Sequence, residues 1–112
     1  MTVGAGNKIT IAAKCSPEAR YLDRVSEAGL EAVELYTNEA WLARRAEVVR
    51  CCRQYPLIYA IHAPVEGCLL EPLADLAREL EAVAVIYHPV FWEDEWQRLV
   101  ETTGSGILER EP

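Results

Sequence analysis

The chain has 112 residues, of which 51% are hydrophobic and 26% are charged, and its formal net charge is −7. This balance is typical of a globular domain rather than a disordered chain, and the negative charge disfavours nucleic acid and anionic membranes as partners. No apolar segment approaches the ~20 residues of a membrane span, and no secretory signal is recognisable, so we expect a cytoplasmic protein with reduced cysteines.

Five short aliphatic or β-branched segments recur along the chain, and their first residues are 23, 25, 25 and 24 positions apart. They are residues 9–14, 32–36, 57–62, 82–88 and 106–109. Each has the length of a β-strand, and the third and fourth are almost continuously apolar, which is typical of strands covered on both faces. The spacing indicates a repeated supersecondary unit.

Helical patterns separate these strands. The first begins at Ser16, an N-cap followed by a proline, and ends at Gly29. The second begins at Asn38, the third begins at Pro72, and the fourth contains Trp92 just before a run of acidic residues. Strands that alternate with helices of this length form βαβ units, a parallel sheet and right-handed crossovers.

The predicted fold class is therefore α/β, with one domain over residues 1–112 that forms a parallel (βα)4-β half of a TIM barrel. A closed barrel needs eight strands and roughly 200–250 residues, so the first and last strands would have open edges. Because open edges pair with other chains, we expect a homodimer in which two half-barrels complete one another. An open five-stranded sheet is the monomeric alternative.

The two histidines of the chain occupy the same place in successive repeats, where His62 ends the third strand and His88 ends the fourth. Glu109 ends the fifth strand. Ligands of parallel α/β proteins bind at the carboxyl ends of the strands, and neighbouring strands lie about 4.8 Å apart. Two imidazoles and a carboxylate facing a common centre suit Zn²⁺, Mn²⁺ or Fe²⁺ with an open position that can polarise a carbonyl. A hydrogen-bonded core residue is the simpler interpretation of either histidine alone.

Three further residues are candidates for substrate binding at the same ends of the first two strands: Lys14, Glu34 and Tyr36. Glu34 has a structural alternative as a buried carboxylate paired with Lys14 or Arg110, because an unpaired buried charge is costly. Tyr36 has a structural alternative as a packing residue.

Four of the strand segments resemble strands of the xylose isomerase-like TIM barrels, a superfamily of sugar-phosphate isomerases and epimerases that also includes type IV AP endonucleases. The resemblance is carried in order by AGLEAVEL at 28–35, IHAP at 61–64, VIYHP at 85–89 and GILE at 106–109. It covers only the N-terminal half of that fold. The chain departs from the family pattern at Val90, where the family has glycine, and at Arg110, where it has asparagine.

The resemblance implies that His62, His88 and Glu109 are catalytic residues and metal ligands, and that Glu34 lies in the substrate pocket. The implied activity is that of a metal-dependent sugar isomerase or epimerase, which abstracts a proton next to a polarised carbonyl. The alternatives are a non-catalytic half-barrel that binds a small molecule or a partner, and the N-terminal piece of a split or truncated enzyme. The endonuclease branch is disfavoured by the net charge of −7.

Overall fold

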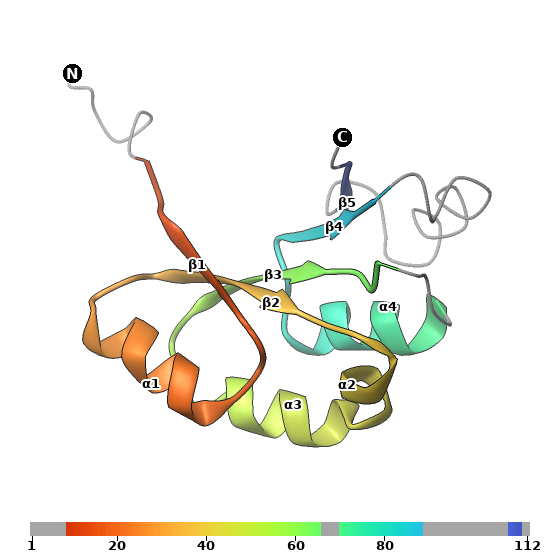
Figure 1. Ribbon diagram of the computed structural model, residues 1–112, viewed down its shortest axis with the longest axis horizontal. Coiled ribbons are helices and arrows are strands. Elements are labelled where there is room, and N and C mark those ends of the chain that lie inside the picture. The colour runs from red at the N-terminus through yellow and green to blue at the C-terminus, as the bar shows by residue number, and fades with distance from the viewer. Residues whose placement is uncertain (1–8, 66–69, 89–107, 111–112) are drawn as a thin grey trace.

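The computed structural model describes residues 9–65, 70–88 and 108–110, the last three by their backbone (Figure 1). Strands and helices follow one another as β1 (Ala12–Cys15), α1 (Ala19–Glu27), β2 (Ala32–Tyr36), α2 (Glu39–Ala43), α3 (Arg45–Cys52), β3 (Ile58–His62), α4 (Leu70–Glu79), β4 (Ala84–Tyr87) and β5 (Leu108–Arg110). None of the helices in these ranges is long and apolar enough to cross a membrane.

The strands form one sheet in the order β1-β2-β3-β4-β5, and every neighbouring pair is parallel. Near the carboxyl ends, Tyr36 is the register partner of His62, His62 is that of Ile86, and Ile86 is that of Glu109. The predicted α/β class and parallel sheet are confirmed. The sequential strand order is compatible with half of a TIM barrel.

The described helices all lie on one side of the sheet (Figure 1). Alternate strand residues such as Leu35, Ile61 and Val85 point to that side and pack into one cluster with Leu22 and Leu73 of the helices. We call this side the helix-covered face. The opposite side, on which no described helix lies, is called the uncovered face, and by the same alternation it carries Lys14, Glu34, Ala60, His62 and Ile86. Helices on one side only are typical of barrels, whereas doubly wound sheets carry them on both.

The first helix starts later than the sequence predicts. The Ser16 side chain caps no helix; instead the Ser16 carbonyl accepts from the Glu18 N–H at 2.8 Å, and α1 begins after the extended residue Glu18. The predicted stop at Gly29 is confirmed, with φ at +78°. There the N–H of Leu30 bonds to the carbonyl of Val25, and that of Gly29 bonds to the carbonyl of Ser26, which is a Schellman motif.

The helix predicted from Asn38 is broken into α2 and α3. The start is confirmed, because Asn38 Oδ1 accepts from the Trp41 N–H at 2.8 Å. The break falls at Arg44, whose φ of −105° and ψ of 30° leave the helical region. Its guanidinium lies 4.9 Å from the Trp41 ring centroid and bonds to Glu47 at 2.7 Å, so one side chain contacts both helices. The predicted fourth helix, around Trp92, lies outside the described residues.

Polar contacts tie the helical layer together. Arg45 of α3 pairs with Glu79 of α4, and Arg53 donates to the Glu79 carbonyl at 3.0 Å. Tyr55, which follows α3, donates to Asp23 of α1 at 2.6 Å. Neighbouring helices are thus joined at their outer surface as well as through the core.

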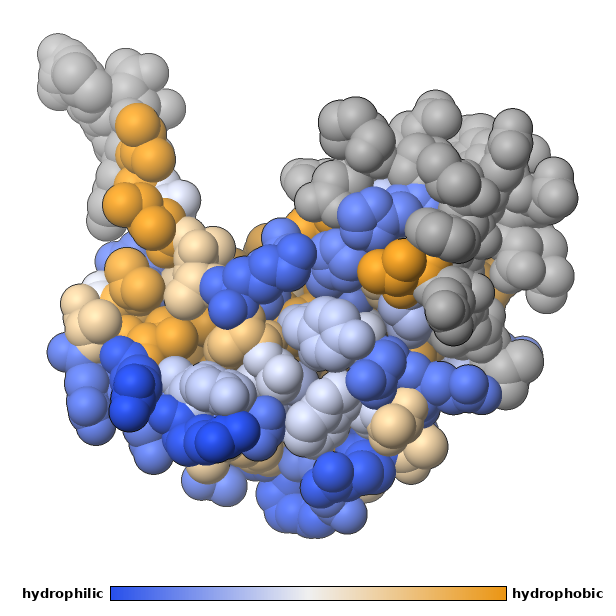
Figure 2. Space-filling model, in the orientation of Figure 1, coloured by the Kyte–Doolittle hydropathy of each residue, from blue (hydrophilic) through white to orange (hydrophobic). Residues whose placement is uncertain are grey.

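Apolar side chains project from the chain just before β1. Ile9 and Ile11 are both largely exposed, and Figure 2 shows apolar surface on this protruding segment, away from the body of the molecule. Within the described residues, β1 pairs with β2 alone, so its other edge carries backbone groups without a strand partner.

Candidate functional site

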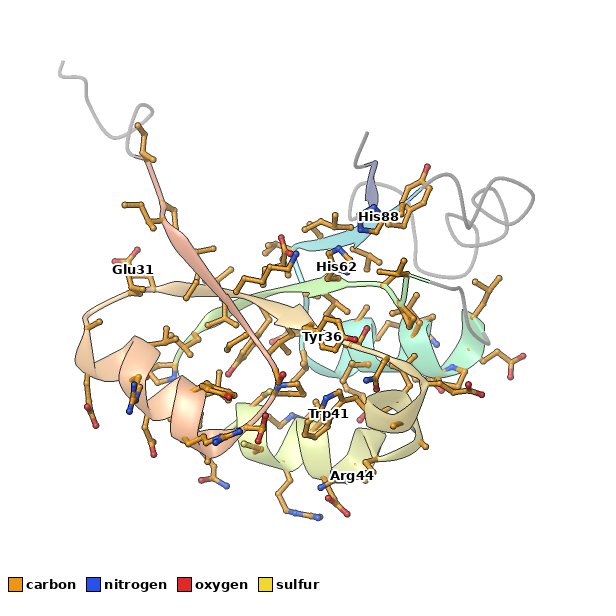
Figure 3. All side chains as sticks on the ribbon, in the orientation of Figure 1. Glu31, Tyr36, Trp41, Arg44, His62 and His88 are labelled. Atoms are coloured by element: carbon orange, nitrogen blue, oxygen red, sulfur yellow. The ribbon has the colours of Figure 1, made fainter. Side chains whose placement is uncertain are left out.

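The two histidines meet at the carboxyl ends of β3 and β4. Their Nε2 atoms are 3.0 Å apart, and the ring centroids are 4.9 Å apart with the planes tilted by 55°. Figure 3 shows the two rings side by side, on the side of the sheet away from the helices. The arrangement follows from the parallel register, since His62 pairs with Ile86, and His88 stands two residues further on the same side.

The contacts of His62 determine which of its nitrogens carries the proton. Its Nδ1 lies 2.9 Å from the Ala63 carbonyl oxygen, and a carbonyl can only accept. Nδ1 is therefore the protonated nitrogen of the neutral ring, and Nε2 presents a lone pair. With His62 in this tautomer, His88 is the donor in the contact of 3.0 Å between the two Nε2 atoms. In this arrangement one proton lies between the two Nε2 atoms.

Thr37 reaches His62 from the neighbouring strand. Its hydroxyl donates to the His62 carbonyl at 2.5 Å, and Thr37 is only 1% exposed. The sequence analysis missed this residue, because a threonine between the end of a strand and the Asn38 N-cap is typical of a loop. The available signal was its place directly after Tyr36, the register partner of His62.

Lys14 and Glu34 form an ion pair on the uncovered face, further from the carboxyl ends of the strands than the histidines. Lys14 Nζ lies 3.2 Å from Glu34 Oε2, and the two side chains are 56% and 20% exposed. Glu34 Oε2 is itself buried and lies at ion-pair distance from the ammonium group, but it accepts no hydrogen bond from the residues that the structure describes. The structural alternative for Glu34 is thus borne out in part, since it is paired with Lys14 but keeps an unused acceptor.

Two of the other predicted site residues are placed only by register. Tyr36 is the partner of His62 at the end of β2 and is partly exposed (Figure 3). Glu109 is the partner of Ile86 on β5, but its side chain lies outside the described residues. Among the residues that the structure describes, no three His, Cys, Asp or Glu side chains converge to hold a metal.

The described cysteines are poor nucleophiles. Cys15, Cys51 and Cys52 are all free thiols. Burial, followed by the neighbouring Cys51, raises the pKa of Cys52 to about 12. The pKa of Cys15 is also raised, by burial first and by Glu18 second, so the adjacent Lys14 does not activate it.

Two charged side chains that line a hollow on the helical layer are paired within that layer. This hollow of about 640 Å³ lies between α2, α3 and α4, and it is lined by Arg45 and Asp75 among others. Arg45 is paired with Glu79, and Asp75 is paired with Arg78. These charges form ion pairs within the helical layer. The histidine pair at the ends of β3 and β4 is therefore the better candidate for a functional site.

Comparison with known proteins gives no family assignment. No protein-family model, no curated protein and no solved structure matches the chain. The resemblance to xylose isomerase-like barrels therefore stays a prediction that rests on the four strand motifs. The structure itself establishes a small α/β domain with an all-parallel sheet.

Proposed function

We propose that the uncovered face binds a small sugar-like molecule at the carboxyl ends of β2, β3 and β4, and that the protein is a metal-dependent isomerase or epimerase. His62 and His88 would hold the divalent ion. The observation that supports this proposal is the contact of 3.0 Å between their Nε2 atoms. Two imidazole nitrogens at adjacent strand ends are the ligand type that zinc, manganese and iron share.

The histidine pair fits a metal ion in two respects. Two nitrogens bound to a tetrahedral Zn²⁺ at 2.0–2.1 Å lie about 3.3 Å from each other, only a few tenths of an ångström wider than the present contact. The Nδ1 proton of His62 is held by a backbone carbonyl, which is the usual way of orienting a metal-binding imidazole. His88 would have to move its proton from Nε2 to Nδ1. Glu109, on the next strand, is the proposed third ligand and acid/base.

A bound metal would supply a Lewis acid that polarises a carbonyl or hydroxyl oxygen. The residues of this chain would orient the rest of the molecule. Glu34 offers a carboxylate oxygen to which no described residue donates a hydrogen bond, and Lys14 offers a partly exposed ammonium group paired with that carboxylate. His62 lies one strand across from Glu34 and two residues further towards the carboxyl ends. This offset separates their Cα atoms by about 8 Å, a distance that a small sugar can span.

A non-catalytic binding protein is the second candidate. It is favoured by one observation: in the described part of the chain only two potential ligands converge, and most catalytic metal sites use three. In that case the histidine pair would serve as a hydrogen-bonding element for a small molecule. The two candidates differ in whether a metal binds, and not in where the ligand lies.

The proposal includes a homodimer that closes the site. The free edge of β1 and the exposed isoleucines before it offer a surface for a second copy of the chain. Sedimentation equilibrium of the full chain should give twice the 12.6 kDa of one subunit. A monomer at micromolar concentration would contradict the dimer and leave the uncovered face open to water.

The decisive experiment uses nitrogen-15 spectra of the two imidazoles in untagged protein, titrated with Zn²⁺ and Mn²⁺. Because the chain has only two histidines, each signal can be assigned with one variant. We expect stoichiometric Zn²⁺ to shift both rings, and His62→Gln or His88→Gln to weaken binding at least about 100-fold. Cys51→Ser is the control, since it removes a partly exposed thiol on the helical layer and should leave the titration unchanged.

Turnover is tested on the metal-loaded protein with a panel of aldoses, ketoses and their phosphates in deuterated water. Proton abstraction from the carbon next to a carbonyl introduces deuterium at this carbon, and proton NMR detects the exchange as a loss of the corresponding proton signal. Neither imidazole responding to any divalent metal would refute the metal-dependent enzyme. Sugar-induced shifts at His62 without metal and without deuterium exchange would establish the non-catalytic candidate instead.

A further inference from the structure

The peptide unit that joins His62 to Ala63 is held from both neighbouring strands. Its oxygen accepts from the Thr37 hydroxyl at 2.5 Å on the β2 side. Its N–H donates to the Ile86 carbonyl at 2.7 Å on the β4 side. A peptide unit is planar, so bonds at its two ends fix its rotation about the chain. The backbone directly after His62 therefore cannot turn without breaking one of them.

The orientation of the His62 ring depends on that peptide. The ring Nδ1 donates to the Ala63 carbonyl, which belongs to the next peptide unit along the chain. A tilt of the first unit would move this carbonyl away from the ring and remove the bond that selects the Nδ1 proton. The contacts thus run from Thr37 through the backbone to the His62 ring, and end at the Nε2 atom that faces His88.

We infer that Thr37 is a positioning residue for the histidine pair: its hydroxyl holds the peptide that follows His62 and thereby keeps the His62 Nε2 lone pair directed at His88. The inference rests on the proposed function, in which the His62 Nε2 lone pair binds the metal ion. Thr37 itself lies one strand away and is buried, so it touches neither ligand nor metal.

A purely structural role makes a different prediction. A buried hydroxyl needs a partner in any case, so removing it destabilises the fold wherever it stands. Tyr59 provides the matched comparison, because its buried hydroxyl also donates to a backbone carbonyl, that of Cys52, at 2.8 Å. Tyr59 lies on β3 like His62, but its side chain points to the helix-covered face.

The test compares Thr37→Val, Thr37→Ser and Tyr59→Phe in the full chain without metal, at about pH 8.5, well above the ordinary histidine pKa. In Thr37→Val we expect the His62 nitrogen signals to move from the Nδ1–H tautomer towards a mixture of tautomers. Zn²⁺ affinity should fall at least about 10-fold, as for other residues that orient a metal ligand. Thr37→Ser keeps the hydroxyl and should restore both readouts, and Tyr59→Phe should change neither.

Each outcome bears on one of the two proposals. Unchanged His62 signals in Thr37→Val would overturn the positioning role. A changed tautomer in a protein that binds no metal even as wild type would keep the positioning role and refute the metal-dependent function. If Thr37→Val does not fold, the wild-type protein decides: a hydroxyl proton held at 2.5 Å exchanges slowly with water, and failure to detect it overturns the inference.

Discussion

The two faces of the sheet differ although they are built from the same strands. On β2, Leu35 is 0% exposed within the core, whereas its neighbour Glu34 carries a charge and an unused acceptor. On β3, Ile61 packs on the helices, whereas His62 meets the other histidine. The helix-covered face thus carries the apolar core, whereas the opposite face carries titratable groups, of which His62 is itself buried. Alternation along a strand is what allows stability and candidate chemistry to be separated within five residues.

The largest expected effect is the loss of unfolding free energy on truncating a buried side chain, which should be greater on the helix-covered face. Leu35→Ala should lower the free energy of unfolding by about 3 kcal/mol, because it removes a fully buried side chain and leaves a cavity. Ile58→Ala, on the uncovered face and 47% exposed, should lower it by about 1 kcal/mol. Urea denaturation of both variants measures the difference. Equal losses would mean that something covers the uncovered face as tightly as the helices cover the other.

The next expected effect concerns alkaline pH and involves a thiol on the helix-covered side. Burial raises the pKa of Cys52 from 9.0 to about 12, so the folded protein keeps this thiol protonated while the unfolded chain ionises it. The stabilisation is complete below about pH 9 and is lost as the pH rises towards 12. The urea midpoint should therefore fall above pH 9, and it should fall less steeply in Cys52→Ala. A midpoint independent of alkaline pH would contradict this linkage.

The smallest expected effect belongs to the uncovered face. Glu34→Gln should change the free energy of unfolding by no more than about 0.5 kcal/mol, since its partner Lys14 is more than half exposed and solvent screens the pair. The same variant should weaken sugar binding if the proposed function holds. Thermal unfolding and a ligand titration measure the two effects. A stability loss above about 2 kcal/mol would make Glu34 a structural residue.

Most of the fold could be predicted because it depends on spacing. The recurrence of apolar segments every 23 to 25 residues located all five strands to within a few residues of their observed bounds. The break at Arg44 could not be predicted, because the apolar periodicity continues across it, and the contacts of the Arg44 side chain with Trp41 and Glu47 leave no mark in that periodicity. Ser16 failed as an N-cap for a similar reason, since backbone bonds formed the turn instead.

The candidate site was predictable to the extent that register follows from repetition. His62 and His88 follow one another at the ends of neighbouring strands, on the same side and two positions apart in the register, so parallel pairing brings their rings together. The proton arrangement between them was not predictable, because it depends on the Ala63 carbonyl. Thr37 was missed because its hydroxyl bonds across strands to a residue 25 positions away, and no local pattern marks such a contact. The orientation of the Glu109 side chain towards the two histidines remains a prediction.

The sequential strand order has a consequence for how the chain folds. Register partners on neighbouring strands are separated by 20 residues between Ala12 and Ala32, and by 26 between Ala32 and Ile58. Each pairing therefore closes a loop of similar, short length, and the entropy of closure grows only slowly with that length. Pairings of this separation are still non-local, so we expect the sheet to form more slowly than a helical bundle of the same size, with a similar entropic cost for each successive βα unit.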